Sequence, residues 1–260
     1  MRVETYELPG PYLFRSMKTT YVISACQHGK DLPTILQMLL ERPPTPQLTV
    51  MYLMDAGEGV QQAHKQIVQL EKETHASVLV LDETSRYTRH MTPESIMEVE
   101  ALLTGVGYRN ANVHPVTMIA LGAVPLLSTP VARGGKVGYL AVWRGLGMHA
   151  LVLTRRARRH IADMSRKERS DVAYGYELYK SLRTITPLKP LVTTTTVAEN
   201  NTGDAELSML DTGLRWLLWA RTGDEMYYRL HMLGACGGLG TVAVAFMGGV
   251  LVIAAVSACG

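Results

Sequence analysis

Short apolar runs alternate with amphipathic helical segments between residues 20 and 142, and this alternation limits the possible folds more than any other feature of the chain. Strands that are apolar on both faces need cover on both faces, and helices provide it when they connect parallel strands. A right-handed crossover packs each connecting helix against the sheet. The pattern therefore predicts a protein of the α/β class with a parallel sheet.

Five apolar, mostly β-branched runs are the predicted strands: residues 21–25, 48–54, 77–81, 113–121 and 137–142. Helices are predicted between them wherever apolar residues recur at steps of three and four, as from Val60 to Leu70. Thr92 followed by Pro93 is typical of a helix start. A Rossmann-like sheet is expected, and four residues should lie on adjacent parallel strands: Tyr21, Val50, Val80 and Val142.

The chain is predicted to have three parts. Residues 1–145 form the Rossmann-like α/β domain, 146–231 a basic and mostly helical second region, and 232–260 an apolar C-terminal element. Between residues 144 and 169 eight arginines and lysines stand against two acidic residues. The formal charge of the whole chain is only +3, so any case for an anionic partner is local to this segment.

Polar residues follow the first three predicted strands, at the edge where open α/β sheets bind ligands. The candidate ligand-binding residues are Cys26, His28, Asp55, Asp82 and Glu83. A cysteine two residues from a histidine suits a thiolate with its base, and two acidic strand ends suit a metal or a ribose. The alternative is that these residues are polar only because the chain meets water there. No complete catalytic constellation is present, so no catalytic residue is assigned.

Cofactor signatures are weak. The turn after the first strand contains one glycine, Gly29, and no GxGxxG sequence, so nucleotide binding there has no signature and the cofactor is unknown. Gly238, Gly240 and Ala243 match GxGxxA, but the stretch lacks a lysine that would reach phosphate. Three cysteines are too few and too scattered for a zinc site or a disulfide framework, and no metal site is predicted.

The basic segment offers guanidinium groups to an anionic partner through Arg155, Arg156, Arg158 and Arg159. Nucleic-acid phosphates, lipid head groups and other protein surfaces are all compatible with it. The alternative is that these arginines form a solvent-exposed helix face and contact no partner. No aromatic residue alternates with these arginines, so base stacking lacks support and nucleic acid is the less favoured partner.

No charged residue occurs from Met232 to Gly260. Residues 239–259 would span about 32 Å as a helix, enough to cross a bilayer as a tail anchor. The rival interpretations are a buried hairpin that turns at Gly248 and Gly249, and a soluble core helix. The N-terminus shows no secretory signal. A cytoplasmic body, membrane-anchored at its C-terminus under the first interpretation, is expected.

These features favour a non-catalytic subunit of a larger assembly, membrane-associated if the tail anchor is correct. Its α/β body would bind a small ligand, another protein subunit or a second copy of itself. One alternative is a ligand-sensing or enzymatic domain that uses the strand-end residues. Another is a coat or shell subunit whose apolar end is buried between copies.

Overall fold

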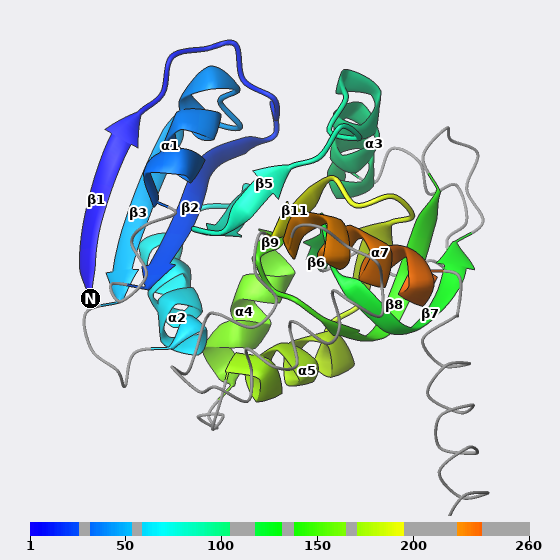
Figure 1. Cartoon of the computed structure of the whole chain (residues 1–260). Helices are drawn as coiled ribbons and strands as arrows, with labels where there is room; N and C mark the ends of the chain where they lie inside the picture. Colours follow the sequence, from blue (N-terminus) through cyan, green and yellow to red (C-terminus); the bar gives the residue numbers. More distant parts are fainter. Residues whose placement is uncertain are drawn as a thin grey trace, which may run out of the picture.

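The computed structural model describes residues 1–25, 32–53, 59–104, 118–131, 138–164, 171–194 and 223–235. They form one large sheet with helices on both faces (Figure 1). Across this sheet the strand order is β1 (Arg2–Glu7), β3 (Gln47–Leu53), β2 (Met17–Ala25), β4 (Ser77–Asp82), β9 (Ala150–Leu153), β6 (Met118–Ala120), β10 (Thr184–Pro187), β8 (Tyr139–Leu146) and β7 (Val124–Val131). A second, two-stranded sheet pairs β5 (Ser85–Tyr87) with β11 (Val192–Thr194).

Six of the nine strands run in one direction, and β1, β9 and β8 run in the other. Strands β3, β2 and β4 are parallel neighbours, with Val22 opposite Val50 and Tyr21 opposite Val80. The predicted α/β, Rossmann-like fold is confirmed, and so is the adjacency of Tyr21, Val50 and Val80.

Val142 corrects the prediction, because its strand β8 is antiparallel to both neighbours and lies far from β4 in the sheet. Strands β7 and β8 are separated by only residues 132–138, too few for the crossover that parallel neighbours require. Pro125 and Pro130 interrupt the apolar pattern of β7, so the sequence analysis missed the first strand of this pair.

The described residues contain six helices: α1 (Leu32–Glu41), α2 (Val60–Leu70), α3 (Pro93–Thr104), α4 (Arg155–Asp163), α5 (Asp171–Ser181) and α7 (Gly223–Ala235). Helices α1 and α3 pack on one face of the sheet, and α2, α4 and α5 on the other. Helix α7 packs on β7 and β11, where buried His231 contacts the carbonyl oxygens of Ala123 and Leu188.

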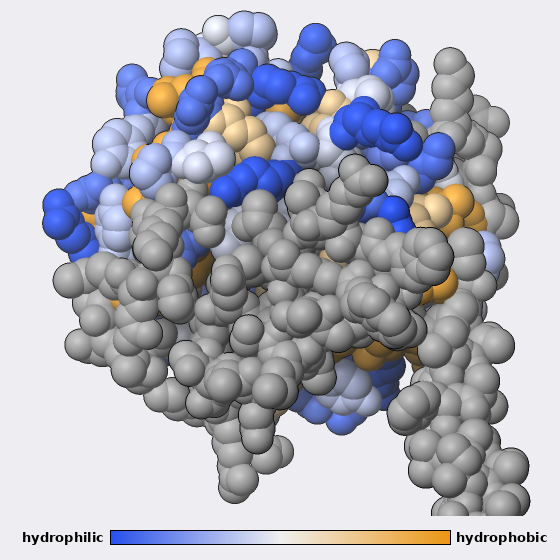
Figure 2. Space-filling model, viewed as in Figure 1, coloured by the Kyte–Doolittle hydropathy of each residue, from blue (hydrophilic) through white to orange (hydrophobic). Residues whose placement is uncertain are grey.

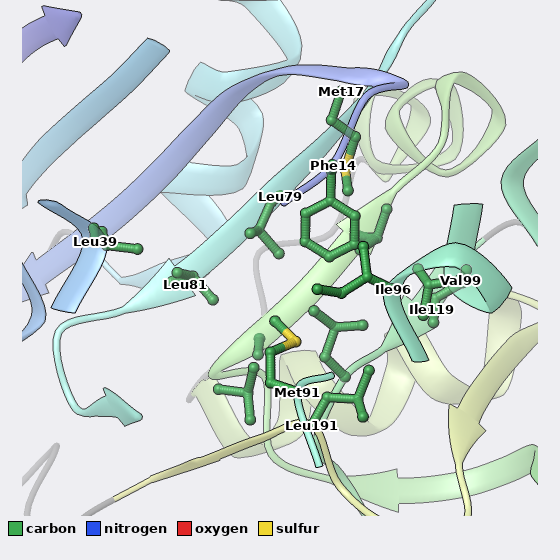
Figure 3. Packing of buried hydrophobic residues seen from close by; sticks show 14 of the residues in the cluster. Phe14, Met17, Leu39, Leu79, Leu81, Met91, Ile96, Val99, Ile119 and Leu191 are labelled. Carbon is green, nitrogen blue, oxygen red and sulfur yellow. The ribbon is translucent and has the colours of Figure 1, made fainter. Parts of the chain in front are cut away.

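Two buried clusters fill the space between these layers, because successive strand side chains point to opposite faces. On β4, Leu79 and Leu81 belong to the cluster beneath α1 and α3. Val78 and Val80 belong to the cluster beneath α2, α4 and α5. Figure 3 shows Leu79 and Leu81 in the first cluster, together with Phe14 from the chain before β2.

Local hydrogen bonds fix where the helices begin. The backbone amide of Ser95 donates to Thr92 Oγ1 at 3.4 Å, and that of Thr92 to Ser95 Oγ at 3.0 Å, so Thr92 caps α3 as predicted. Helix α4 begins after Thr154, whose side chain accepts from the Ala157 amide. Helix α2 is different, because its first amide, Val60, donates to the side chain of Asp171 at 3.0 Å.

Residues 146–231 supply strands to the same large sheet. Strand β9 lies between β4 and β6, and β10 lies between β6 and β8, so the boundary predicted at residue 145 falls within the sheet. The apolar segment 236–260 lies outside the described residues, as do the candidate membrane-spanning residues 239–259. None of the six described helices combines the length and apolarity needed to cross a membrane.

Candidate functional site

The chain changes direction across the sheet at β2. From β2 it passes through α1 to β3 on one side, and from β3 through α2 to β4 on the other side of β2. Helix α1 follows β2 and α2 follows β3, and the two helices lie on opposite faces, so the connections that leave β2 and β3 diverge, while β4 pairs with the other side of β2. Open α/β sheets bind ligands at such a switch point. Ser24 lies near this point, close to the end of β2. Asp82 is the last residue of β4, and Glu83 follows it.

Ser24 and Glu83 join the two strand ends. The Ser24 hydroxyl donates to Glu83 Oε2 at 2.6 Å, and both side chains are buried. The Glu83 amide donates to the carbonyl oxygen of Ile23 at 3.1 Å. Glu83 therefore has a structural role, because its carboxylate accepts a hydrogen bond that links the carboxyl ends of β2 and β4.

Asp82 is held differently, through one of its two carboxylate oxygens. Oδ1 accepts from the Thr84 amide at 2.9 Å, the Thr84 hydroxyl at 2.6 Å and the Ser85 hydroxyl at 3.2 Å. Oδ2 has no hydrogen-bond partner within the described part of the chain, and the side chain is partly exposed. The carboxylate is thus fixed in orientation while one oxygen stays able to accept from a ligand.

Burial raises the pKa of Asp82 to about 6, although the hydrogen bonds from Thr84 and Ser85 oppose the rise. The neighbouring carboxylate of Glu83 adds to the increase. A carboxyl group with such a pKa changes protonation near neutral pH. It can therefore accept hydrogen bonds from ligand hydroxyls above pH 6 and donate one below.

The small sheet supplies the next layer of the site. Thr84 Oγ1 lies 2.6 Å from Thr194 Oγ1 of β11. Since Thr84 gives its only hydroxyl proton to Asp82, Thr194 is the donor in this pair. The single hydroxyl proton of Ser85 is shared between Asp82 Oδ1, at 3.2 Å, and the carbonyl oxygen of His149, at 2.6 Å, and the shorter contact is the stronger one. The turn that carries Asp82 is therefore anchored to both β11 and the start of β9.

His149 and Tyr227 form a buried wall beside this turn. Their rings meet edge to face with centroids 4.6 Å apart. Burial lowers the pKa of His149 to about 4 and raises the pKa of Tyr227 well above its ordinary value, so both are neutral at pH 7. The Tyr227 hydroxyl has no hydrogen-bond partner among the described residues.

Gly147 makes room for that hydroxyl. Its φ is +91°, and a Cβ at this position would lie 2.3 Å from the Tyr227 oxygen. Both the left-handed conformation and the close approach favour glycine. Gly147 also accepts a hydrogen bond at its carbonyl oxygen from Tyr179, at 2.7 Å.

The predicted site residues divide into two groups. Asp82 and Glu83 lie at the end of β4, as expected, whereas Cys26, His28 and Asp55 lie outside the described residues. The residues predicted from the sequence did not include Ser24, Thr84, Thr194, His149 and Tyr227. No local pattern could reveal the last three, because β11, β9 and α7 reach the site only through tertiary pairing.

The four arginines of the basic segment have different surroundings. The prediction places Arg158 against an external anion, but the side chain is 3% exposed and its guanidinium donates to backbone carbonyls of Thr74 at 2.6 Å and Ala76 at 2.7 Å. Arg155 lies against His75, with 2.6 Å between side-chain nitrogens. Arg156 and Arg159 are exposed.

Comparisons with known proteins give limited information. No protein-family model matches the chain, and no curated protein sequence matches it. Among solved structures, apo UDP-glucose pyrophosphorylase is similar with a TM-score of 0.35 and 9% identity, over 65% of this chain and 72% of that one. The same enzyme complexed with UDP-glucose gives a TM-score of 0.36 and 11% identity over the same shares.

Proposed function

We propose that the protein binds a small, hydroxyl-bearing ligand at the carboxyl ends of β2 and β4, with Asp82 as its main acceptor. The observation that carries this proposal is the asymmetry of the Asp82 carboxylate. Oδ1 is held by two neighbouring residues, while Oδ2 has no partner in the described part of the chain. A pair of sugar hydroxyls, as in a ribose, is a natural donor to a carboxylate at this edge of an α/β sheet.

A non-catalytic role accompanies this proposal. Asp82 is able to exchange a proton near neutral pH, but the described residues around it provide no nucleophile paired with a base. The ligand would then act as a signal or a structural effector. If Cys26 or His28 also contact it, the alternative of an enzymatic domain becomes the better description.

Ribonucleosides with and without the 2′-hydroxyl test the ligand proposal. Adenosine, guanosine, cytidine and uridine are titrated into the protein and followed by ligand-observed NMR, with the 2′-deoxy compounds as matched controls. We expect at least one ribonucleoside to bind more tightly than its deoxy form. Asp82→Asn should weaken that binding about tenfold or more, because it removes a charged acceptor.

Asp163→Asn, an exposed carboxylate at the end of α4, is the matched control and should leave binding unchanged. Equal binding of ribose and deoxyribose forms, or an unaffected Asp82→Asn variant, would contradict the proposal.

A second candidate function, a subunit in an assembly, is favoured by exposed apolar side chains on the β7–β8 pair. Leu127 is 59% exposed and Trp143 57% exposed. Figure 2 shows hydrophobic surface on the side of the molecule where β7 and β8 lie. Membrane attachment through residues 239–259 stays a prediction, and carbonate-resistant pelleting of the full chain is its test.

Light scattering at increasing protein concentration tests the assembly candidate. The double variant Leu127→Ser with Trp143→Ser should lower the average mass if copies meet through this surface. Leu40→Ser, an equally exposed leucine on α1, is the control. An unchanged mass in the double variant would rule out this surface as the contact between copies.

A further inference from the structure

A polar pocket of about 330 Å³ lies at the other end of the same strands, beside the amino-terminal halves of β2 and β3. Its buried floor consists of Thr19, Tyr21, Thr49 and Glu71. Its more exposed rim consists of Val3, Thr5, Lys18, Gln47, Leu70 and Thr74. The volume is within the range of small-molecule sites.

Strand register explains why this pocket is polar. Thr5 of β1, Thr49 of β3 and Tyr21 of β2 are opposite one another across three adjacent strands. Further along the same face, Ile23 and Met51 belong to the buried apolar cluster. Helix α2 ends at Leu70, so the strand segments beyond its end meet Glu71 and Thr74 in place of an apolar helix face.

Glu71 is the lining residue that most restricts which ligand the pocket can bind. The side chain is 7% exposed, and the Tyr21 hydroxyl donates to its Oε1 at 2.7 Å. Oε2 has no hydrogen-bond partner within the described ranges. Oε2 is not fully enclosed, so water in the pocket reaches it. A ligand hydroxyl in the pocket would replace that water by donating a hydrogen bond to Oε2.

Nearby cations decide what kind of donor fits. The Arg158 guanidinium interacts electrostatically with both Glu71 and Tyr21, and it donates a hydrogen bond to the Thr74 carbonyl oxygen at 2.6 Å. Lys18 stands at the rim and makes no hydrogen bond or ion pair within the described residues. An ammonium group in the pocket would be attracted by one charge, Glu71, and repelled by two, Arg158 and Lys18. A neutral hydroxyl would be repelled by neither cation, and an anionic substituent near Lys18 would be attracted.

We propose that this pocket binds a small polyhydroxylated compound, with one hydroxyl donating to Glu71 Oε2 and an anionic substituent, such as phosphate, toward Lys18. On the floor, Thr49 Oγ1 lies 3.2 Å from Thr5 Oγ1, and Thr19 donates to Gln47 Oε1 at 3.4 Å. Both hydroxyl oxygens keep the capacity to accept from further ligand hydroxyls. This site is separate from the one at Asp82, and it does not depend on the ligand proposed there.

The first experiment compares ligands by ligand-observed NMR. Galactose, myo-inositol and sorbitol are neutral polyols, and galactose 6-phosphate and galactosamine are charged counterparts of the first. We expect binding of at least one neutral polyol, with galactose 6-phosphate tighter and galactosamine weaker than galactose. Absence of binding by all polyols at tens of millimolar, or tightest binding by galactosamine, would overturn the proposal.

The second experiment uses variants of the full chain. Glu71→Gln keeps an acceptor for Tyr21 but removes the charged acceptor in the pocket, and it should weaken polyol binding about tenfold. Glu73→Gln, an exposed neighbour that does not line the pocket, is the control. Lys18→Met should remove the preference for the phosphate and leave galactose binding unchanged, whereas Lys72→Met should change neither.

Leu70→Trp keeps the proposal testable if Glu71→Gln fails to fold. Leu70 is 50% exposed on the rim, so a larger side chain there would obstruct the pocket without removing a core contact. We expect it to abolish polyol binding while the melting temperature stays close to that of the wild type. Undiminished binding in Leu70→Trp, or equal effects of Glu71→Gln and Glu73→Gln, would place the polyol elsewhere.

Discussion

Two carboxylates near opposite ends of strand β2, Asp82 and Glu71, lie in different electrostatic surroundings. At the carboxyl ends, Oδ1 of Asp82 accepts from its own turn, and the neighbouring charge is a second acid, Glu83. At the amino ends, Oε1 of Glu71 accepts from Tyr21, and the neighbouring charge is the guanidinium of Arg158. Burial raises the pKa of Asp82 to about 6 and the Glu83 carboxylate adds to the rise, whereas the charge nearest Glu71 is a cation.

Both ends depend on the same buried sheet, and breaking it should have the largest effect. Val80 is fully buried on β4, opposite Tyr21 of β2 and two residues before Asp82. Val80→Asp would place a charge without a partner in the core and should lower the free energy of unfolding by about 4 kcal/mol or more. Urea denaturation measures this loss. Val3→Asp, on the exposed edge strand β1, should change stability by less than about 1 kcal/mol.

Replacing Arg158 tests the Glu71 end of the strands separately from the Asp82 end. Arg158→Met leaves the carbonyl oxygens of Thr74 and Ala76 without their donor and Glu71 without its neighbouring cation, so we expect a loss of about 2 to 4 kcal/mol. Arg159→Met, on the exposed side of the same helix, should cost about 0.5 kcal/mol or less. Equal losses of stability in the two variants would mean that the hydrogen bonds of the buried guanidinium do not contribute to stability as described.

The pH dependence of stability should show the smallest effect, at Asp82. Its folded pKa of about 6 lies above the ordinary value of 3.8, so the folded state binds the proton more tightly than the unfolded chain does. Stability from this group is therefore greatest below pH 4 and is lost as the pH rises through 6. Relative to wild type, Asp82→Asn should gain about 2 kcal/mol between pH 4 and pH 8.

Comparing the two proteins at each pH cancels the opposite contribution of His64 and His149, whose lowered pKa values make the fold less stable in acid. A constant difference between wild type and Asp82→Asn across this range would show that the carboxyl titrates normally.

The sequence predicted the part of the fold that local periodicity controls. Strands β2, β3 and β4 and helices α1 to α3 lie where apolar spacing and Thr92 indicated them. Strand β9 was missed because its four buried residues enter the sheet between β4 and β6, and nothing in their own sequence specifies those partners. The α/β class and the position of Asp82 therefore followed from local pattern, but the mixed sheet did not.

Arg158 and Glu71 show why the surroundings of some residues could not be predicted from the sequence. A run of arginines predicts a solvent-facing surface, yet one of them is buried because backbone carbonyls before β4, distant in sequence, accept its hydrogen bonds. Glu71 follows the end of a helix, where an acidic residue is unremarkable in sequence. It lines a pocket only because the register of β1, β3 and β2 brings a row of hydroxyls opposite it.

We propose that each end of the parallel strands binds its own ligand through one carboxylate oxygen that accepts no hydrogen bond within the described residues. The most direct test is a crossed NMR titration, in which the ribonucleoside and the polyol that bind the wild type are each titrated into Asp82→Asn and Glu71→Gln. Our account predicts that Asp82→Asn loses only the ribonucleoside and Glu71→Gln only the polyol. Loss of both ligands in one folded variant, or of neither ligand in either variant, would contradict it.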